Sequence, residues 1–428
     1  MAADHARHPP SHTPGRPISE QPTPVATAHV TAPYGPLADA LTIAAFGTVC
    51  APNPAQSAVL IEADDTGLTL RTHDYETAVS ITVPTATVTR AGASLLPLAQ
   101  LTKSLKAMVA GETKATAART TITLAGDLLT TDHLTVPVTG LPVGEFVPAH
   151  KPATVAAHLD AQDLHRQLQR VLPAAGTDDT LPVLMGVQMT LTGRTLTLST
   201  TDRYRFTVAD LPATPHPDHP QTIAADPAPL TALVPASVLN RLSKHLKTQT
   251  GTVGIAFGTF GLTLTVDTTT ITIRELDGNL PRYGSMFPTK VDTSLTMHRA
   301  TAERALKKCR ALITASGERG SPVTLRWDDH GTLTLAPRIG EPEDRARIKG
   351  MTIASTTLAG TTPTAREVHA SPSFLKDALE AFAGDDTVTL HLRNQKEGST
   401  NVPPFLFTAG PHPTATDYRH LLMPVRVS

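Results

Sequence analysis

Residues 181–211 read LPVLMGVQMTLTGRTLTLSTTDRYRFTVADL, which is the pattern of three short antiparallel strands. An apolar run over 183–189 is followed by a turn at Gly193 and then by TLTLS, in which leucines alternate with threonines. Alternation with a period of two indicates a strand with one buried face. The third strand is expected to begin in TTDRYRF, where arginine and aromatic side chains come together.

Two weaker copies of this stretch lie on either side of it. Residues 58–84 repeat the apolar strand, the turn at Gly67 and the LTL strand, and they carry Asp74 where the central copy has Asp202. Residues 321–352 repeat the apolar strand, a glycine turn and TLTL. A supersecondary unit that recurs at domain-sized spacing predicts a repeat architecture.

Each copy is framed by two expected helices and a further run of threonine-rich strands. Apolar residues at helical spacing define six helices, at 35–49, 94–110, 160–175, 235–249, 301–316 and 371–384. The sequence therefore predicts an α+β fold of three repeated domains, each with two helices packed on antiparallel sheets, at 31–150, 151–290 and 291–428. Residues 1–30, rich in proline and histidine, are expected to form a disordered tail.

Composition restricts the class of protein. The chain has 428 residues, which is room for two to four domains, and a formal net charge of −1. Its two cysteines, Cys50 and Cys309, have no metal-ligand spacing, which fits a reducing cytoplasm better than a disulfide framework or a zinc site. No apolar run approaches the roughly 20 residues of a membrane span. We therefore expect a cytoplasmic protein with no cofactor and no metal.

Motifs of common enzyme classes are not found. The sequence has no GxxxxGK[ST] loop, no GxSxG elbow and no HExxH pair. Paired aspartates at 64–65, 178–179, 328–329 and 385–386 lie beside expected turns or helix ends, where turn chemistry explains them. We therefore expect no catalytic residue. A repeat-built enzyme with a site between domains stays as an alternative, which a cleft of perturbed titratable groups would reveal.

Basic side chains are concentrated in the expected helices, whereas the strands are threonine-faced and nearly neutral. In a chain with almost no net charge, this distribution predicts a local positive surface that binds phosphates without reading a sequence. The alternative is an ordinary solvated surface. The candidate residues are Lys103, Lys106, Arg166, Arg170, Arg241, Lys244, Lys247, Arg304, Lys307 and Lys308.

The order of the units and three motifs together carry a resemblance to a known family. The motifs are TTDRYR (200–205), LDGNLPRYGSMFP (276–288) and the terminal DYRHLLMPVRVS (417–428). Over about 31–428 the chain resembles the bacterial DNA polymerase III β subunit, the β sliding clamp. The resemblance implies a DNA polymerase processivity factor without catalytic activity. In that family three-domain protomers form a head-to-tail homodimer, a closed ring with helices facing duplex DNA and sheets outside.

The resemblance also implies specific sites. A groove between the second and third domains would receive peptides of the replicative DNA polymerase, the clamp loader and other clamp-binding proteins. The matching residues are Leu184, Thr201, Arg203, Tyr204, Arg205, Phe206, Pro281, Met286, Phe374, Leu421, Leu422, Met423, Pro424, Val425, Arg426 and Val427. Arg205 and Arg426 are expected to hold polar groups of the peptide at its rim. The dimer contact would use Val136 and Val138 on the first domain and Leu312 and Ile313 on the third.

Two positions depart from the family pattern within this presumed groove. Phe206 stands where a smaller aliphatic residue is usual, and Ser285 stands where arginine is frequent. These departures support an alternative function as a divergent, actinobacterial-type paralogue that confers resistance to a clamp-directed antibiotic or serves an accessory replicon. A threonine-rich β-repeat structural protein is a more remote alternative, which predicts a secretion signal and helices without a basic bias.

Overall fold

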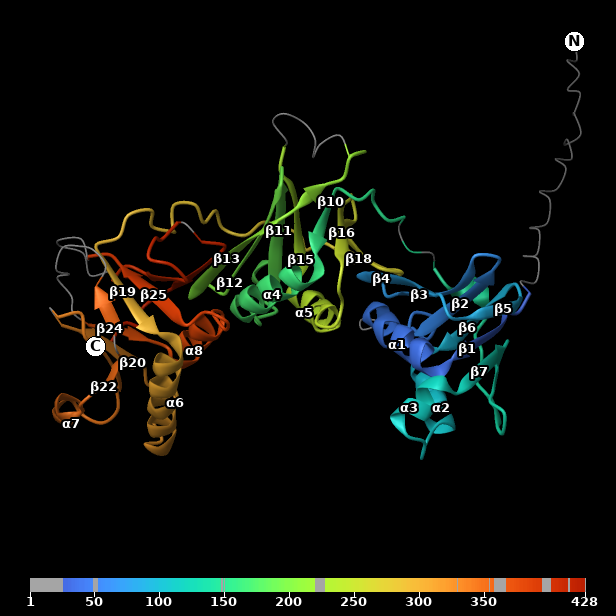
Figure 1. Cartoon of the computed structure of the whole chain (residues 1–428), viewed down its shortest axis with the longest axis horizontal. Coiled ribbons are helices and arrows are strands. Elements are labelled where there is room, and N and C mark those ends of the chain that lie inside the picture. The colour runs from blue at the N-terminus through green and yellow to red at the C-terminus, as the bar shows by residue number, and fades with distance from the viewer. Residues whose placement is uncertain are drawn as a thin grey trace, which may run out of the picture.

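The computed structural model describes residues 26–48, 53–147, 149, 151–219, 228–328, 330–353, 355–357, 367–394, 402–414 and 416–427. These residues form an arc of three β-rich bodies, with strands along its outer side and helices along its concave side (Figure 1). The arrangement confirms the expected α+β class with antiparallel sheets.

All six expected helices are present, although most are a few residues shorter than the apolar pattern indicated. They are α1 (Tyr34–Ala44), α2 (Leu98–Met108), α4 (Ala161–Val171), α5 (Ala236–Leu246), α6 (Arg299–Ala315) and α8 (Pro372–Glu380). Each turns an apolar stripe toward the sheets; Leu239, Leu242 and Leu246 of α5 have no exposed surface. Two short helices were not expected because they carry no such stripe: α3 (Lys114–Arg119) and α7 (Pro342–Arg347).

Two smaller sheets lie toward the two ends of the arc. The sheet at the N-terminal end has the order β5 (Thr87–Arg90), β1 (His29–Pro33), β7 (Thr121–Ala125), β8 (Leu128–Thr130) and β9 (Thr135–Pro137). The sheet at the other end has the order β22 (Met351–Ile353), β21 (Leu333–Pro337), β20 (Val323–Trp327) and β24 (Glu367–Ala370). Strand β1 corrects the expected tail, because His29 and Val30 pair with β7 instead of belonging to a disordered segment. Residues 1–25 lie outside the described residues.

Two nine-stranded sheets join the repeat units to one another. The first has the order β14 (Thr214–Pro215), β10 (Ala157–Asp160), β16 (Thr252–Phe257), β17 (Gly261–Val266), β18 (Thr269–Arg274), β4 (Thr77–Val83), β3 (Gly67–His73), β2 (Ala58–Asp64) and β6 (Gly92–Pro97). The second has the order β15 (Leu230–Pro235), β11 (Gly186–Thr192), β12 (Thr195–Thr201), β13 (Arg205–Pro212), β27 (Tyr418–Leu422), β26 (Phe405–Thr408), β25 (Thr387–Leu392), β19 (Thr293–His298) and β23 (Ser355–Thr357). The pairs β4–β18 and β13–β27 therefore carry the backbone hydrogen bonding across both expected domain boundaries.

The repeat seen in the sequence has a structural cause at one turn. The Asp74 carboxylate accepts a hydrogen bond from the Thr77 amide at 2.8 Å, and the Asp202 carboxylate accepts one from the Arg205 amide at 3.0 Å. The residue after each aspartate has a left-handed backbone, with φ of 71° at Tyr75 and 78° at Arg203. The aspartate side chain caps the turn and tolerates this conformation. The two copies therefore share a turn as well as a hydrophobic pattern.

The central stretch differs from expectation in two places. Pro182–Met185 forms a 3₁₀ turn, so the first strand begins at Gly186 rather than at residue 183. Proline favours this because its fixed φ and missing N–H suit the first turn of a helix. The third strand begins only at Arg205, which leaves Tyr204 in the turn. The side chain of Tyr204 is 55% exposed as a result.

Candidate functional site

The turn between β12 and β13 presents the most exposed aromatic side chain of the described residues. Buried Thr201 holds this turn closed, because its hydroxyl donates to the Arg205 carbonyl at 2.6 Å and accepts from the Arg203 amide at 3.1 Å. Exposed Arg203 and Tyr204 are thereby held at the tip. The turn belongs to the second repeat unit and faces elements of the third.

Two elements of the third repeat unit pack against this turn. The ring of Phe374, on α8, stacks on Tyr204 with ring centroids 6.0 Å apart and an interplanar angle of 27°. The Met423 amide donates to the Tyr204 carbonyl at 2.8 Å, and the Val425 amide donates to the carbonyl of His369 at 2.8 Å. The C-terminal segment thus runs from the tip of the turn to β24.

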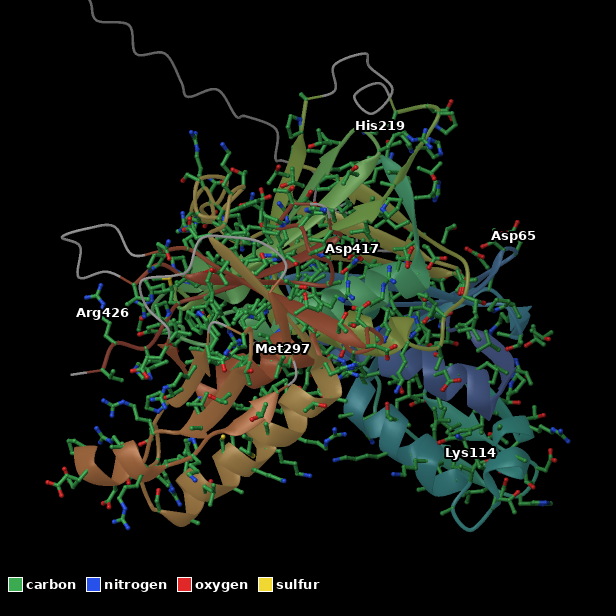
Figure 2. The ribbon with its side chains drawn as sticks, turned by 60° about the vertical axis from the view of Figure 1, so that its left-hand side comes forward. Asp65, Lys114, His219, Met297, Asp417 and Arg426 are labelled. Atoms are coloured by element: carbon green, nitrogen blue, oxygen red, sulfur yellow. The ribbon has the colours of Figure 1, made fainter. Side chains whose placement is uncertain are left out.

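Exposed apolar side chains also occur on the segments that flank this junction between the second and third repeat units. Met286 and Met423 are each 42% exposed, and Val427 is 37% exposed. Half-buried Leu184 and exposed Pro281 belong to the second-unit segments 181–185 and 276–288, while Phe374, Pro424 and Val425 are half-buried members of the third unit. Arg426 extends from the C-terminal segment at the edge of the molecule (Figure 2). Flexible methionines beside rigid aromatic rings are typical of a surface that accepts varied apolar partners.

Besides Thr201 and Arg205, three of the sixteen expected groove residues are buried beneath this surface. Phe206 is 3% exposed, and Leu421 and Leu422 are also buried. Phe206 contacts Tyr283 and Phe287 through ring centroids 5.2 Å and 5.9 Å away. These rings and Leu421 belong to one apolar cluster, which supports the floor of the junction.

Arg205 corrects the expectation of a peptide-holding residue at the rim. Its guanidinium is buried, lies 2.9 Å from Asp202 and 2.6 Å from Asp377, and donates to the carbonyl of Pro173. It also lies over the Phe374 ring, 4.4 Å from the centroid. A buried cation needs these partners to offset its lost hydration, so its donors are engaged inside the protein.

A cavity of about 500 Å³ opens beside this junction, and the sequence did not indicate it. It lies where the end of α4, the 3₁₀ turn at 182–185 and the start of α5 meet. Its mostly apolar lining includes Leu172, Pro173, Gly176, Pro182, Met185 and Leu276. Only the apolar character of LPVLM in 181–185 could have suggested it, and that run reads equally well as a buried strand.

Most of the candidate phosphate-binding residues are exposed on helices of the concave side. Lys244 on α5 and Lys247, which directly follows this helix, are exposed. Arg241 on α5 is half-buried, and its guanidinium carbon lies over the Phe46 ring, 5.8 Å from the ring centroid. Arg166 is exposed and pairs with Asp163 at 2.9 Å. The other exposed members are Lys103 and Lys106 on α2 and Arg304, Lys307 and Lys308 on α6.

Arg170 was expected among these residues, and the structure corrects this. It is only 9% exposed, and its guanidinium lies 3.1 Å from Asp417 and 3.4 Å from Asp385. Asp417 lies where strands of the second and third units meet (Figure 2). Arg170 therefore connects two repeat units, and its charge is compensated there.

The four expected dimer residues do not all reach the surface. Val138 is fully buried and Ile313 is 6% exposed, so these two side chains belong to the core of the chain. Leu312 is 49% exposed on α6, and Val136 is half-buried on β9. Exposed Leu134, which immediately precedes β9, was not predicted because a single leucine in a polar loop gives no pattern.

Asp64 and Asp178, each the first member of an aspartate pair, cap turns as expected, whereas Asp329 of another pair lies outside the described residues. The Asp64 carboxylate accepts hydrogen bonds from Thr66, and that of Asp178 accepts them from Thr180; these bonds hold the pKa of each carboxyl below its usual value. Within the described ranges, no three His, Cys, Asp or Glu side chains form a group that could hold a metal ion. None of the helices described is long and apolar enough to cross a bilayer.

Comparison with known proteins agrees with this architecture. A family model described as the central domain of the DNA polymerase III beta subunit matches residues 158–282. The beta sliding clamp of Streptomyces coelicolor is 29% identical, over 88% of this chain and 93% of its own length. The beta sliding clamp homolog GriR of Streptomyces muensis is 28% identical, over 80% of this chain and 85% of its own length.

A solved structure shows the same fold. The DNA polymerase sliding clamp from Bacillus subtilis superposes with a TM-score of 0.77 at 18% identity, covering 94% of this chain and all of that one. Family model, relatives and fold agree with the motifs at 200–205 and 417–428. In its central domain, in its relatives and in its fold, this chain is thus similar to the β sliding clamps, the β subunits of DNA polymerase III.

Proposed function

We propose that this protein is a DNA polymerase processivity factor without catalytic activity. Two protomers, each with domains at 31–150, 151–290 and 291–428, would close head to tail into a ring around duplex DNA. The ring would tether the replicative polymerase and other proteins that carry clamp-binding peptides. The observation that carries the proposal is that helices α2, α4, α5 and α6 lie along the concave side of the arc (Figure 1) and that each of them carries exposed lysine or arginine residues.

A basic concave face suits a protein that slides. Lysine and arginine contacts with phosphates are screened by salt and carry no sequence information, so they exchange freely along the duplex. Contacts with base edges would instead fix a register. Retention in this proposal comes from the closed shape, and the charges only centre the duplex.

The two ends of the arc are suited to a head-to-tail contact. One end carries the edge strand β9 with exposed Leu134, and the other carries α6 with exposed Leu312. The two surfaces are different, so a contact between them is heterologous and closes only if its rotation completes a ring. An unpaired edge such as β9 is also a surface that a partner strand or helix can cover.

The junction around Tyr204 is the proposed peptide groove. Met286, Met423, Phe374 and Tyr204 supply apolar surface, and Arg203 and Arg426 supply exposed charge at its margin. Removal of residues 423–428 leaves β27 complete, because that strand ends at Leu422. The shortened protein should keep its fold and lose affinity for a clamp-binding peptide of the replicative polymerase; unchanged affinity would place the peptide site elsewhere.

Light scattering coupled to small-angle X-ray scattering tests the assembly directly. The expected result is a dimer of twice 45.2 kDa with the scattering profile of a hollow ring. A compact or elongated monomer at all concentrations would contradict the ring and would leave the fold unaffected. Leu134→Arg and Leu312→Arg variants should each shift the mass toward the monomer, whereas Leu181→Arg, at an exposed leucine of the second unit, should not.

A specialised paralogue is the second candidate function, and Phe206 favours it. This residue packs with Tyr283 and Phe287 under the proposed groove, where a smaller side chain would leave more room. A groove altered in this way can discriminate between a partner peptide and a clamp-directed antibiotic. If Phe206→Leu binds inhibitor and peptide with the same ratio of affinities as the native chain, this second function is contradicted.

A further inference from the structure

The junction between the first and second repeat units is built like the junction between the second and third. Strand β4 pairs with β18 of the second unit as β13 pairs with β27 of the third. In the first unit Ala78 lies opposite His73, and in the second unit Phe206 lies opposite Thr201, at the same position after the shared aspartate turn. Ala78 and Phe206 are therefore equivalent residues of the two junctions.

The two junctions differ in how this position is filled. At the second junction Phe206 pairs across the boundary with Leu421, and both belong to an apolar cluster closed by Phe287. At the first junction Ala78 pairs with Thr272, and Ser80 pairs with Thr270. Small and hydroxyl-bearing side chains thus stand where the second junction has Phe206 with Leu421 and Val208 with Arg419, which leaves space on this face of the sheet.

That space is a cavity of about 300 Å³ between the sheet and the segment that connects the two units. Apolar groups from both sides form its body, and they include Leu60, Ala78, Phe146 and Pro152. Ser80, Thr270 and Thr272 contribute hydroxyl groups. Its volume lies at the lower end of the range for small-molecule sites, which suits a ligand with one ring.

The charges around the cavity favour an anion. Arg71 and Glu62 line it as an ion pair of 2.5 Å and largely compensate each other. Lys151 also lines it, is exposed, and forms no ion pair with a carboxylate of the described residues. The lining therefore has one uncompensated positive charge beside an apolar body with a few hydrogen-bonding groups.

We propose that this cavity is a second ligand site, which takes a small single-ring aromatic monocarboxylate. The ring occupies the space beside Ala78 that Phe206 fills at the other junction, and the carboxylate pairs with Lys151. Specificity comes from the match of one charge to an apolar body, as in other small-molecule pockets. This site shares no residue with the proposed peptide groove and does not depend on the proposed function.

The test uses 3-phenylpropionate as the probe and the full chain as the protein. Calorimetric titration or saturation-transfer NMR should show saturable binding in the millimolar range. The neutral isostere 3-phenylpropanol should bind about tenfold more weakly, because it cannot pair with Lys151. Equal affinity for the acid and the alcohol would overturn the assignment of the carboxylate to Lys151.

Three variants locate the site. Ala78→Phe should fill the cavity as Phe206 does at the other junction, and it should abolish binding while thermal unfolding remains cooperative. If that variant does not fold, Thr272→Leu is the alternative test, because Thr272 occupies at the first junction the position that Leu421 occupies at the second. Lys151→Gln should weaken acid binding about tenfold, and Lys349→Gln, a lysine of the third unit, should leave it unchanged. Undiminished binding in a folded Ala78→Phe protein, or no saturable binding to the native chain, would overturn the site.

Discussion

Arg205 and Asp377 form an ion pair of 2.6 Å that joins the second repeat unit to the third. The arginine is 8% exposed, and its other nitrogen atoms are engaged by Asp202 and the carbonyl of Pro173. The same guanidinium covers Phe374, which stacks on Tyr204. The pair therefore fixes the position of α8 relative to the turn that carries the exposed tyrosine.

Removal of one partner of this pair should destabilise the junction. Asp377→Ala leaves a buried guanidinium with one carboxylate fewer, and we expect the free energy of unfolding to fall by about 2–4 kcal/mol. Urea unfolding at constant pH measures the change. Glu380→Ala is the matched control on the same helix, because it removes only the exposed pair with Lys376, and it should cost less than about 1 kcal/mol. Equal losses in the two variants would contradict the role of Arg205 as a junction residue.

Charge reversal on α5 should weaken DNA binding in a salt-dependent way. Lys244→Glu combined with Lys247→Glu removes two exposed cations from the concave side. A plot of log affinity against log salt concentration has a negative slope, and each lost phosphate contact makes that slope shallower by about 0.9. The slope of the double variant should therefore be shallower than the native slope by roughly 2. Fluorescence anisotropy with duplex DNA over a salt series measures it.

The control variant for this experiment reverses the same number of charges at positions away from the concave helices. Arg194→Glu combined with Arg326→Glu reverses two exposed arginines, one in the β11–β12 turn and one on β20, and not on the concave helices. This variant should retain the native salt slope. If both double variants lose the same slope, the DNA contact is not specific to the helices.

Truncation of the exposed tyrosine should affect peptide binding far more than folding. Tyr204→Ala removes a side chain that is 55% exposed and stacks on Phe374, so it should cost less than about 1 kcal/mol of stability. As an aromatic anchor at the centre of a contact, it should cost about 2 kcal/mol or more of binding to a polymerase-derived peptide. Tyr75→Ala, at the equivalent turn of the first unit, should leave that binding unchanged. Calorimetric titration of both variants with the same peptide decides between these outcomes.

Two buried histidines should make the protein less stable in mild acid. Burial lowers the pKa of His420 to about 3 and that of His391 to about 4, whereas an unfolded histidine titrates near 6.5. Between about pH 6.5 and pH 4 the unfolded chain binds protons that the folded chain does not, so the free energy of unfolding falls as the pH is lowered. From about pH 7 to about pH 5 each histidine should contribute a loss of roughly 2 kcal/mol.

Substitution of these histidines should flatten that pH dependence. His391 lies 2.8 Å from the hydroxyl of Ser294 and 2.7 Å from that of Thr408, so His391→Gln keeps hydrogen-bonding capacity and removes the titration. Urea unfolding at about pH 7 and about pH 5 should show a smaller difference than in the native chain. Exposed His133→Gln is the control and should retain the full difference. An unaltered pH dependence in His391→Gln would mean that this residue is already protonated in the folded state.

The repeat and the helices could be predicted because their signals are local. Each helix has its apolar stripe within a few turns, and the aspartate turns at Asp74 and Asp202 are formed by residues three positions apart. The resemblance of 200–205 and 417–428 to known motifs rests on the same short segments. These features survive in the sequence because nearest neighbours along the chain produce them.

The sequence could not predict in this way which charged side chains are buried and which are exposed. Arg166 and Arg170 lie one turn apart on α4, and both were expected at the phosphate-binding surface. Arg166 is exposed, whereas Arg170 is buried against Asp385 and Asp417, which are 215 and 247 positions away in the chain. Arg205 meets Asp377 across a separation of 172 positions. No pattern near an arginine tells which distant carboxylate will compensate it.

The sequence by itself determined the class of fold, the threefold repeat and the concentration of basic residues on helices, because periodicity and turn chemistry act over a few residues. Only the tertiary structure decided that one nine-stranded sheet runs through each of the two unit boundaries. It also decided that Phe206 fills the junction of the second and third units, whereas Ala78 leaves a cavity at the junction of the first and second. The pairings of β4 with β18 and of β13 with β27 join segments far apart in the chain. The physical reason is that burial and charge compensation depend on which surfaces meet, and they meet only after the chain has folded.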